Sequence, residues 1–76
     1  MKKKSDKKFL KDLGKRIREL RKDQEISQDQ LAFEVRIRRE QVIRIEHGEQ
    51  STSISILRKM SDALNMKLKE LLDFEY

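Results

Sequence analysis

Cysteine and proline are absent from the 76-residue sequence, and only two residues are glycine. Without cysteine, the chain forms no disulfide bond and no thiolate metal site, which fits a reducing compartment. With so little proline and glycine, strands and long loops have little support. The sequence also lacks an apolar run of the roughly 18 residues that a membrane span needs, and it lacks a signal-peptide pattern. We therefore expect a helical, cytoplasmic protein with no membrane partner.

Charge, by contrast, is abundant: 43% of the residues are charged, 36% are hydrophobic, and the net charge is +5. A chain of this length is expected to form one domain. Its basic balance favours a polyanionic partner, with nucleic acid ahead of an acidic membrane surface. A rival hypothesis, an amphipathic protein that lies on a membrane surface, lacks the large aromatic residues that usually anchor such helices.

Apolar residues near the N-terminus recur at spacings of three, four and three: Leu10, Leu13, Ile17 and Leu20. This spacing predicts one apolar helix face. Gly14 interrupts the helix at a cost of about 1 kcal/mol relative to alanine, so either another backbone packs close to it or the ordered helix begins there. We predict a basic flexible tail over residues 1–5 and a single domain over residues 6–76. Five lysines here either solubilise the chain or contact phosphates: Lys2, Lys3, Lys4, Lys7 and Lys8.

Capping patterns place the next two helices. Ser27 and Gln30 form a capping box that opens a helix over about residues 28–35. A bend and a helix over about residues 38–47 follow, and Gly48 supplies the preferred left-handed stop. Leu31, Ala32 and Val35 supply the buried face of the first helix, and Val42 and Ile45 turn inward on the second.

The C-terminal third predicts two further helices. The run Ser-Thr-Ser at 51–53 provides a cap for a fourth helix, which Asn65 ends, and a short fifth helix follows near residues 68–72. We therefore expect an all-α bundle of five short helices with no internal repeat.

Four stretches occur in the order and at the spacing of a known family: LGKRIRELRK at 13–22, SQDQLA to VIRIEHG at 27–48, TSISILRKMSDALNM at 52–66 and LKELLDF at 68–74. Together they resemble the phage-repressor/Cro-like (XRE) helix-turn-helix family of DNA-binding transcriptional regulators. The resemblance implies a five-helix, lambda-repressor-like bundle whose third helix lies in the major groove.

The resemblance also implies which residues contact DNA. One set reaches base edges: Arg38, Arg39, Glu40 and Arg44. A second set serves phosphates: Gln28, Arg36, Gln41 and His47. The helical period agrees, because Arg39 and Arg44 lie outward when Val42 and Ile45 turn inward. The planar fork of arginine matches O6 and N7 of guanine. Glu40 either accepts from cytosine N4 or holds Arg44, four residues later.

Two positions depart from the family pattern. Arg36 stands where the bend usually holds glycine, although a left-handed backbone is cheap only for glycine. Arg38 stands where a serine or threonine usually caps the third helix, and the loss of such a cap costs about 1 kcal/mol. As a hypothesis, both departures exchange local stability for positive charge beside the expected groove.

Two structural roles follow from the same resemblance. Arg21 and Glu46 match a buried ion pair that ties the first helix to the end of the third. Dimer contacts in the family involve the C-terminal helix, and the candidates here are Ile56, Leu71, Phe74 and Tyr76. Phe74 and Tyr76 either seal the core or meet a second subunit.

We therefore expect a sequence-specific DNA-binding transcriptional regulator, most simply a homodimeric repressor of a palindromic operator. An antitoxin that also represses its own operon, or a restriction–modification controller protein, would use the same chemistry. A nucleophile–base pair, a phosphate loop and a metal-ligand cluster are not recognisable in the sequence, so we expect no enzyme activity, no metal and no cofactor.

Overall fold

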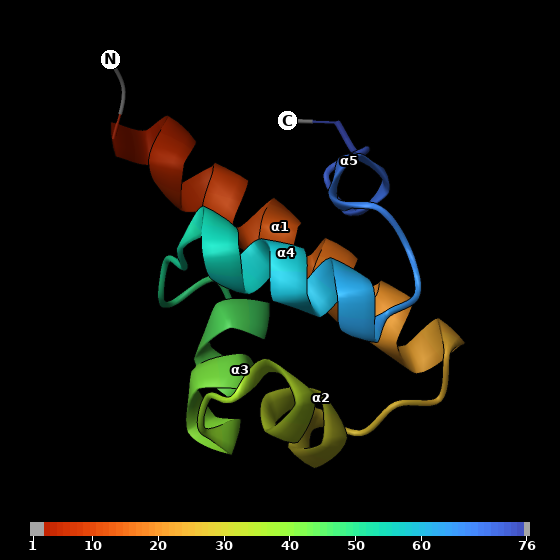
Figure 1. Ribbon diagram of the computed structural model, residues 1–76. Coiled ribbons are helices and arrows are strands. Elements are labelled where there is room, and N and C mark those ends of the chain that lie inside the picture. The colour runs from red at the N-terminus through yellow and green to blue at the C-terminus, as the bar shows by residue number, and fades with distance from the viewer. Residues whose placement is uncertain (1–2, 76) are drawn as a thin grey trace.

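The computed structural model describes residues 3–75, and all regular secondary structure in that range is helical. The helices follow in this order (Figure 1): α1 (Lys3–Asp23), α2 (Gln28–Val35), α3 (Arg39–Glu46), α4 (Ile54–Ala63) and α5 (Leu68–Leu71). The expectation of an all-α, five-helix bundle is confirmed. Within residues 3–75, no helix is long and apolar enough to cross a membrane.

The first helix begins earlier than the sequence pattern predicts. Residues 3–5 already belong to this helix, where the sequence pattern indicated a flexible tail, and residues 1–2 lie outside the described part of the chain. The segment contains neither proline nor glycine before Gly14, and Asp6 in the first turn offsets the positive end of the helix dipole. Both features favour continued helix where charge alone suggested a mobile tail.

Gly14 marks a close approach of two backbones. The helix passes through it without a break, and a Cβ built on Gly14 would lie 2.3 Å from the carbonyl oxygen of Ile45 and 2.5 Å from that of Glu46. The first of the two explanations for this glycine therefore holds. Only a residue without a side chain allows α1 to pack so closely on the end of α3.

Short polar side chains and left-handed residues set the other helix ends. Ser27 Oγ accepts a hydrogen bond from the amide of Gln30 at 3.0 Å, and Ser53 Oγ caps α4 in the same way at 3.1 Å. After α3 and α4 the chain turns at Gly48 (φ 73°) and Asn65 (φ 59°), two residue types that tolerate this conformation. Local chemistry thus determines where most helices stop.

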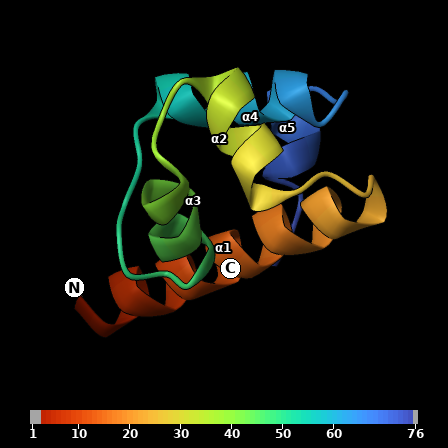
Figure 2. The same ribbon diagram turned by 90° about the horizontal axis from the view of Figure 1, so that it is seen from below.

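The other four helices lie on one side of α1 (Figure 2). α1 contacts α3 and α5, while α2 packs on both α3 and α4. The buried apolar side chains of the core come from all five helices and from Leu64, which directly follows α4: Leu13, Ile17, Leu31, Ala32, Val35, Val42, Ile45, Leu57, Met60, Leu64 and Leu71. Burial of each of these side chains larger than alanine contributes about 1.5–3 kcal/mol, which makes this cluster the main source of stability.

The C-terminal segment corrects one sequence-based expectation. Leu71 is fully buried, with 0% of its surface exposed, so it belongs to the core and offers nothing to a second subunit. Phe74 is half-buried, and its ring lies on that of Phe9 at a centroid distance of 6.0 Å. Ile56 is half-buried on α4, and Tyr76 lies outside the described residues.

Candidate nucleic-acid interface

The bend between α2 and α3 uses a left-handed arginine. Arg36 adopts φ 66° and ψ 44°. Its amide donates to the carbonyl of Phe33 at 3.3 Å, and the next amide, of Ile37, donates to Ala32 at 3.0 Å. These bonds close the end of α2 as a glycine would, but a non-glycine residue in this conformation costs roughly 1–2 kcal/mol. The side chain of Arg36 is exposed, so the strained backbone carries a free positive charge.

The start of α3 lacks a side-chain oxygen at its N-cap, Arg38. A different backbone donor of this turn is satisfied, because the Oε1 atom of Gln41 accepts a hydrogen bond from the amide of Arg38 at 3.0 Å. This is one half of a capping box. The bond fixes the first turn of α3, and it uses the acceptor of Gln41 while leaving the donors of its amide group available.

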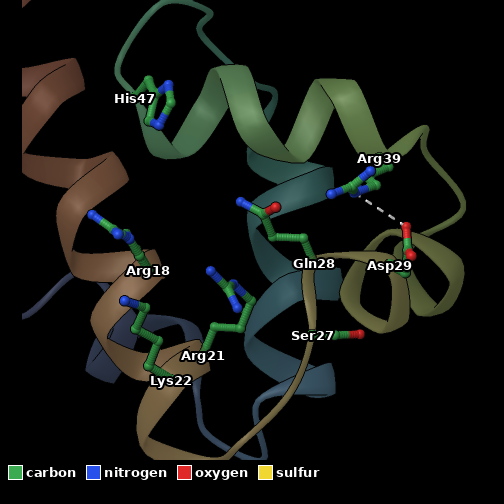
Figure 3. Close-up of a pocket in the computed structure, with 8 residues that line it drawn as sticks. All are labelled: Arg18, Arg21, Lys22, Ser27, Gln28, Asp29, Arg39 and His47. Atoms are coloured by element: carbon green, nitrogen blue, oxygen red, sulfur yellow. Dashed lines mark ion pairs between the residues drawn. The ribbon is translucent and has the colours of Figure 1, made fainter.

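The four predicted base-contacting residues are all exposed: Arg38 at the N-cap of α3, and Arg39, Glu40 and Arg44 on the helix itself. Val42 and Ile45 are buried on the opposite face. Arg39 Nε lies 3.4 Å from Asp29 Oδ1, and both side chains are largely exposed (Figure 3). An ion pair in such an exposed position contributes little, so Arg39 remains free to exchange Asp29 for another partner.

A buried ion pair holds α3 in place. Arg21 Nε donates to Glu46 Oε2 at 2.6 Å, and Arg21 Nη2 donates to Glu46 Oε1 at 3.0 Å. The two side chains are only 10% and 1% exposed. A third bond runs from Arg21 Nη1 to the carbonyl of Ile26 at 2.9 Å. The pair therefore joins the end of α1, the loop before α2 and the end of α3.

Gln28 is a further member of this network, which the sequence did not reveal. Its Nε2 atom donates to Glu46 Oε1 at 3.1 Å. The two residues are 18 positions apart, and no local pattern links them. One N–H of the Gln28 amide is thus held by Glu46, and the other is available at the N-terminus of α2.

An open hollow of about 380 Å³ lies between α1, α2 and α3 (Figure 3). Eight residues line it: Arg18, Arg21, Lys22, Ser27, Gln28, Asp29, Arg39 and His47. It brings together three residues of the predicted contact sets, Gln28, Arg39 and His47. The sequence analysis assigned no role to Arg18 and Lys22. Their spacing of four residues along one helix face was the available indication.

The sequence and the fold both have close counterparts. A sequence model described as "Helix-turn-helix" matches residues 17–71. The chain is 37% identical over 62 residues to the control protein C.BamHI of Bacillus amyloliquefaciens, a match that covers 80% of this chain and 76% of that protein. The crystal structure of the restriction–modification controller protein C.AhdI from Aeromonas hydrophila superposes with a TM-score of 0.79 at 35% identity, over 82% of this chain and 94% of that one.

A third counterpart shows the fold alone. The clp gene regulator ClgR from Corynebacterium glutamicum superposes with a TM-score of 0.80 at 24% identity, over 82% of this chain and 66% of that one. A helix-turn-helix with a rigid bend and an exposed, basic third helix defines a DNA-binding protein of the helix-turn-helix class. The chain belongs to the phage-repressor/Cro-like (XRE) helix-turn-helix family, and it is a DNA-binding transcription regulator.

Proposed function

We propose that this regulator binds a two-fold symmetric operator as a homodimer, with α3 of each copy in the major groove, and that it represses transcription from that site. The observation that carries the proposal is the exposed surface of α3: two exposed arginines stand on the helix and a third at its N-cap, and a buried ion pair fixes the helix. A single short helix reads few base pairs, so two copies would supply the length of a specific site.

The predicted roles of the α3 residues fit their placement. Arg39 and Arg44 are exposed and present forks that suit guanine edges. Arg39 would give up its weak contact with Asp29 when it meets a base. Glu40, also exposed, retains both proposed roles: acceptance from cytosine N4 or support of Arg44.

The proposed phosphate contacts surround that face. Gln28 has one amide N–H left for a phosphate and stands at the positive end of the α2 dipole. Gln41 keeps its amide donors because only its oxygen is used in capping. Arg36 and His47 are exposed at the bend and at the end of α3. These contacts would fix the register of α3 without reading sequence themselves.

A more specific candidate is a controller protein of a restriction–modification system. Of the relatives described above, C.AhdI is named as a restriction–modification controller protein and C.BamHI as a control protein. This favours the controller role over the antitoxin role. These names support the proposal that this chain is a regulator that acts in the cytoplasm without enzyme activity.

The dimer surface remains the C-terminal side of the bundle in this proposal. Ile56 and Phe74 are half-buried and retain apolar surface, whereas Leu71 is excluded by its burial. Ile54, 62% exposed on the same helix as Ile56, adds an apolar side chain that sequence reasoning did not select. Sedimentation of wild type and Ile54→Lys would test this surface. A dimer that persists in the variant would count against it.

Selection of bound duplexes from a random library at near-physiological salt tests the proposed function. We expect enrichment of a palindrome with half-sites about one helical turn apart. Binding without enrichment would contradict sequence-specific readout, and enrichment of a single half-site would contradict the two-fold arrangement.

A further inference from the structure

One side of α1 carries a purely basic row, which we name the α1 stripe: Lys7, Lys11, Arg18 and Lys22. At 100° per residue, these positions fall within about 60° of one another around the helix axis. All four side chains are exposed. At 1.5 Å per residue, the stripe extends about 22 Å along the helix.

The charges of α1 are sorted rather than mixed. The carboxylates of Asp12 and Glu19 lie roughly a quarter-turn away from the stripe and follow lysines by four residues. Lys8 donates to Asp12 Oδ2 at 2.8 Å, and this hydrogen bond, with the attraction between the charges, raises the pKa of Lys8. Lys8 is therefore already paired.

The stripe has no such partners. Among the described residues, none of its four cations lies within ion-pair distance of a carboxylate. Its members form like-charged pairs four residues apart, Lys7 with Lys11 and Arg18 with Lys22, and such pairs destabilise an isolated helix. The arrangement is unfavourable in the free protein and becomes favourable beside a polyanion.

Close packing fixes the α1 stripe beside α3. Between its halves, Gly14 lies against the carbonyls at the end of α3. Gly48, just after α3, lies against Lys11: a Cβ on Gly48 would be 2.7 Å from both Cα and Cγ of Lys11. These contacts set Lys11 next to the C-terminal end of α3.

Two hollows connect the stripe with the α3 face. Arg18 and Lys22 line the hollow of about 380 Å³ that Arg39 also lines. Lys7 and Lys11 line a second, of about 810 Å³, which extends to the turn after α3. His47 lines both. The stripe therefore borders the proposed DNA-binding face along two stretches that meet at the end of α3.

We propose that the α1 stripe binds successive phosphates of the duplex backbone, so that α1 forms a second, sequence-independent edge of the DNA interface. The inference rests on the proposed function and extends it to residues outside the helix-turn-helix. Lys7 and Lys11 also precede the family match, which begins at residue 17. Each phosphate that a lysine or arginine neutralises releases counterions, so the stripe would raise affinity and its salt dependence without changing base preference.

The test compares matched double variants of the full chain. Lys7→Gln/Lys11→Gln and Arg18→Gln/Lys22→Gln each remove one half of the stripe. Lys59→Gln/Lys69→Gln removes the same charge from exposed positions on α4 and α5. Binding to the selected operator and to an unrelated duplex of equal length is measured from 50 to 300 mM salt. Circular dichroism and thermal unfolding confirm that each variant is folded.

For each stripe variant, we expect the slope of log K against log salt to decrease in magnitude by about 1.8 per bound copy, at about 0.9 per lost contact. The decrease should be equal on the two duplexes and absent in the α4–α5 control. Lys7→Arg/Lys11→Arg should keep the wild-type slope, because charge and reach are retained.

Other outcomes separate the two levels of the proposal. Wild-type slopes in both stripe variants, with operator preference intact, would overturn the role of α1 and leave the proposed function standing. A loss confined to the operator would assign the stripe to base readout and overturn the phosphate role. Failure of the unsubstituted chain to bind any duplex would overturn both.

Discussion

The backbone of Gly14 in α1 lies so close to Ile45 at the end of α3 that a Cβ on the glycine would be 2.3 Å from the Ile45 carbonyl oxygen. Two main chains 31 residues apart thus meet without an intervening side chain. The contact positions α3 relative to α1, and it does so beside the Arg21–Glu46 ion pair. A glycine that is unfavourable for its own helix is therefore favourable for the placement of α3.

Gly14→Ala tests this contact. Helix propensity alone would stabilise the variant by about 1 kcal/mol. The clash with two backbone carbonyls instead forces the helices apart, so we expect a net destabilisation of about 1–3 kcal/mol in urea unfolding. Lys15→Ala, an exposed site one residue away on the same helix, should change stability by less than about 0.5 kcal/mol. A Gly14→Ala protein as stable as the parent would show that the two backbones do not pack this closely.

Local signals explain why much of the fold was predictable. Ser53, Gly48 and Asn65 act within a few residues of themselves, so the sequence indicates where helices begin and end. For Gly14 the sequence left two explanations open, because the close packing at this glycine involves the backbone of Ile45, which is distant in the sequence. A run of lysines suggests a mobile tail over residues 1–5, but nothing in that run breaks a helix, and the structure includes residues 3–5 in α1.

The candidate site was predictable to a similar degree. The helical period places Arg39 and Arg44 outward, and the structure finds both exposed. It does not reveal that Gln28 reaches Glu46, because that bond depends on how α2 packs against α3. Leu71 was misassigned for the same reason: periodicity identifies an apolar face, but only packing distinguishes a core face from an interface.

Because Arg36 is both strained and charged, we expect its substitution to change the stability of the fold and the affinity for DNA in different ways. Arg36→Gly relieves the strain at φ 66° and should stabilise the fold by about 1 kcal/mol. Arg36→Ala loses the same charge but keeps the strain, so the difference between the two variants isolates the backbone effect. Both should weaken DNA binding equally if Arg36 contacts a phosphate. Equal stability of the two variants in chemical denaturation would mean that the bend relaxes in solution.

The buried ion pair predicts a large loss of stability when one partner is removed. Glu46→Ala strands the Arg21 guanidinium and also deprives Gln28 of its acceptor, at a cost of about 3–5 kcal/mol. Glu40→Ala, which removes an exposed carboxylate from the same helix, serves as the control and should unfold near the wild-type temperature. If Glu46→Ala melts within error of the parent, the pair has no structural importance.

If Arg39 contacts a base edge, its loss should change the base preference of the protein as well as its affinity. Arg39→Ala should weaken binding to the selected operator by about 1–3 kcal/mol and relax the preference at one base pair. Because Asp29 holds Arg39 at 3.4 Å in the free protein, Asp29→Asn should strengthen binding slightly: it frees the guanidinium and removes a negative charge near the duplex. Titration of both variants against the operator and against its single-base-pair mutants separates the two effects. Weakening by Arg39→Ala that is equal on every sequence would assign Arg39 to a phosphate instead, and readout would then fall to Arg38, Glu40 and Arg44.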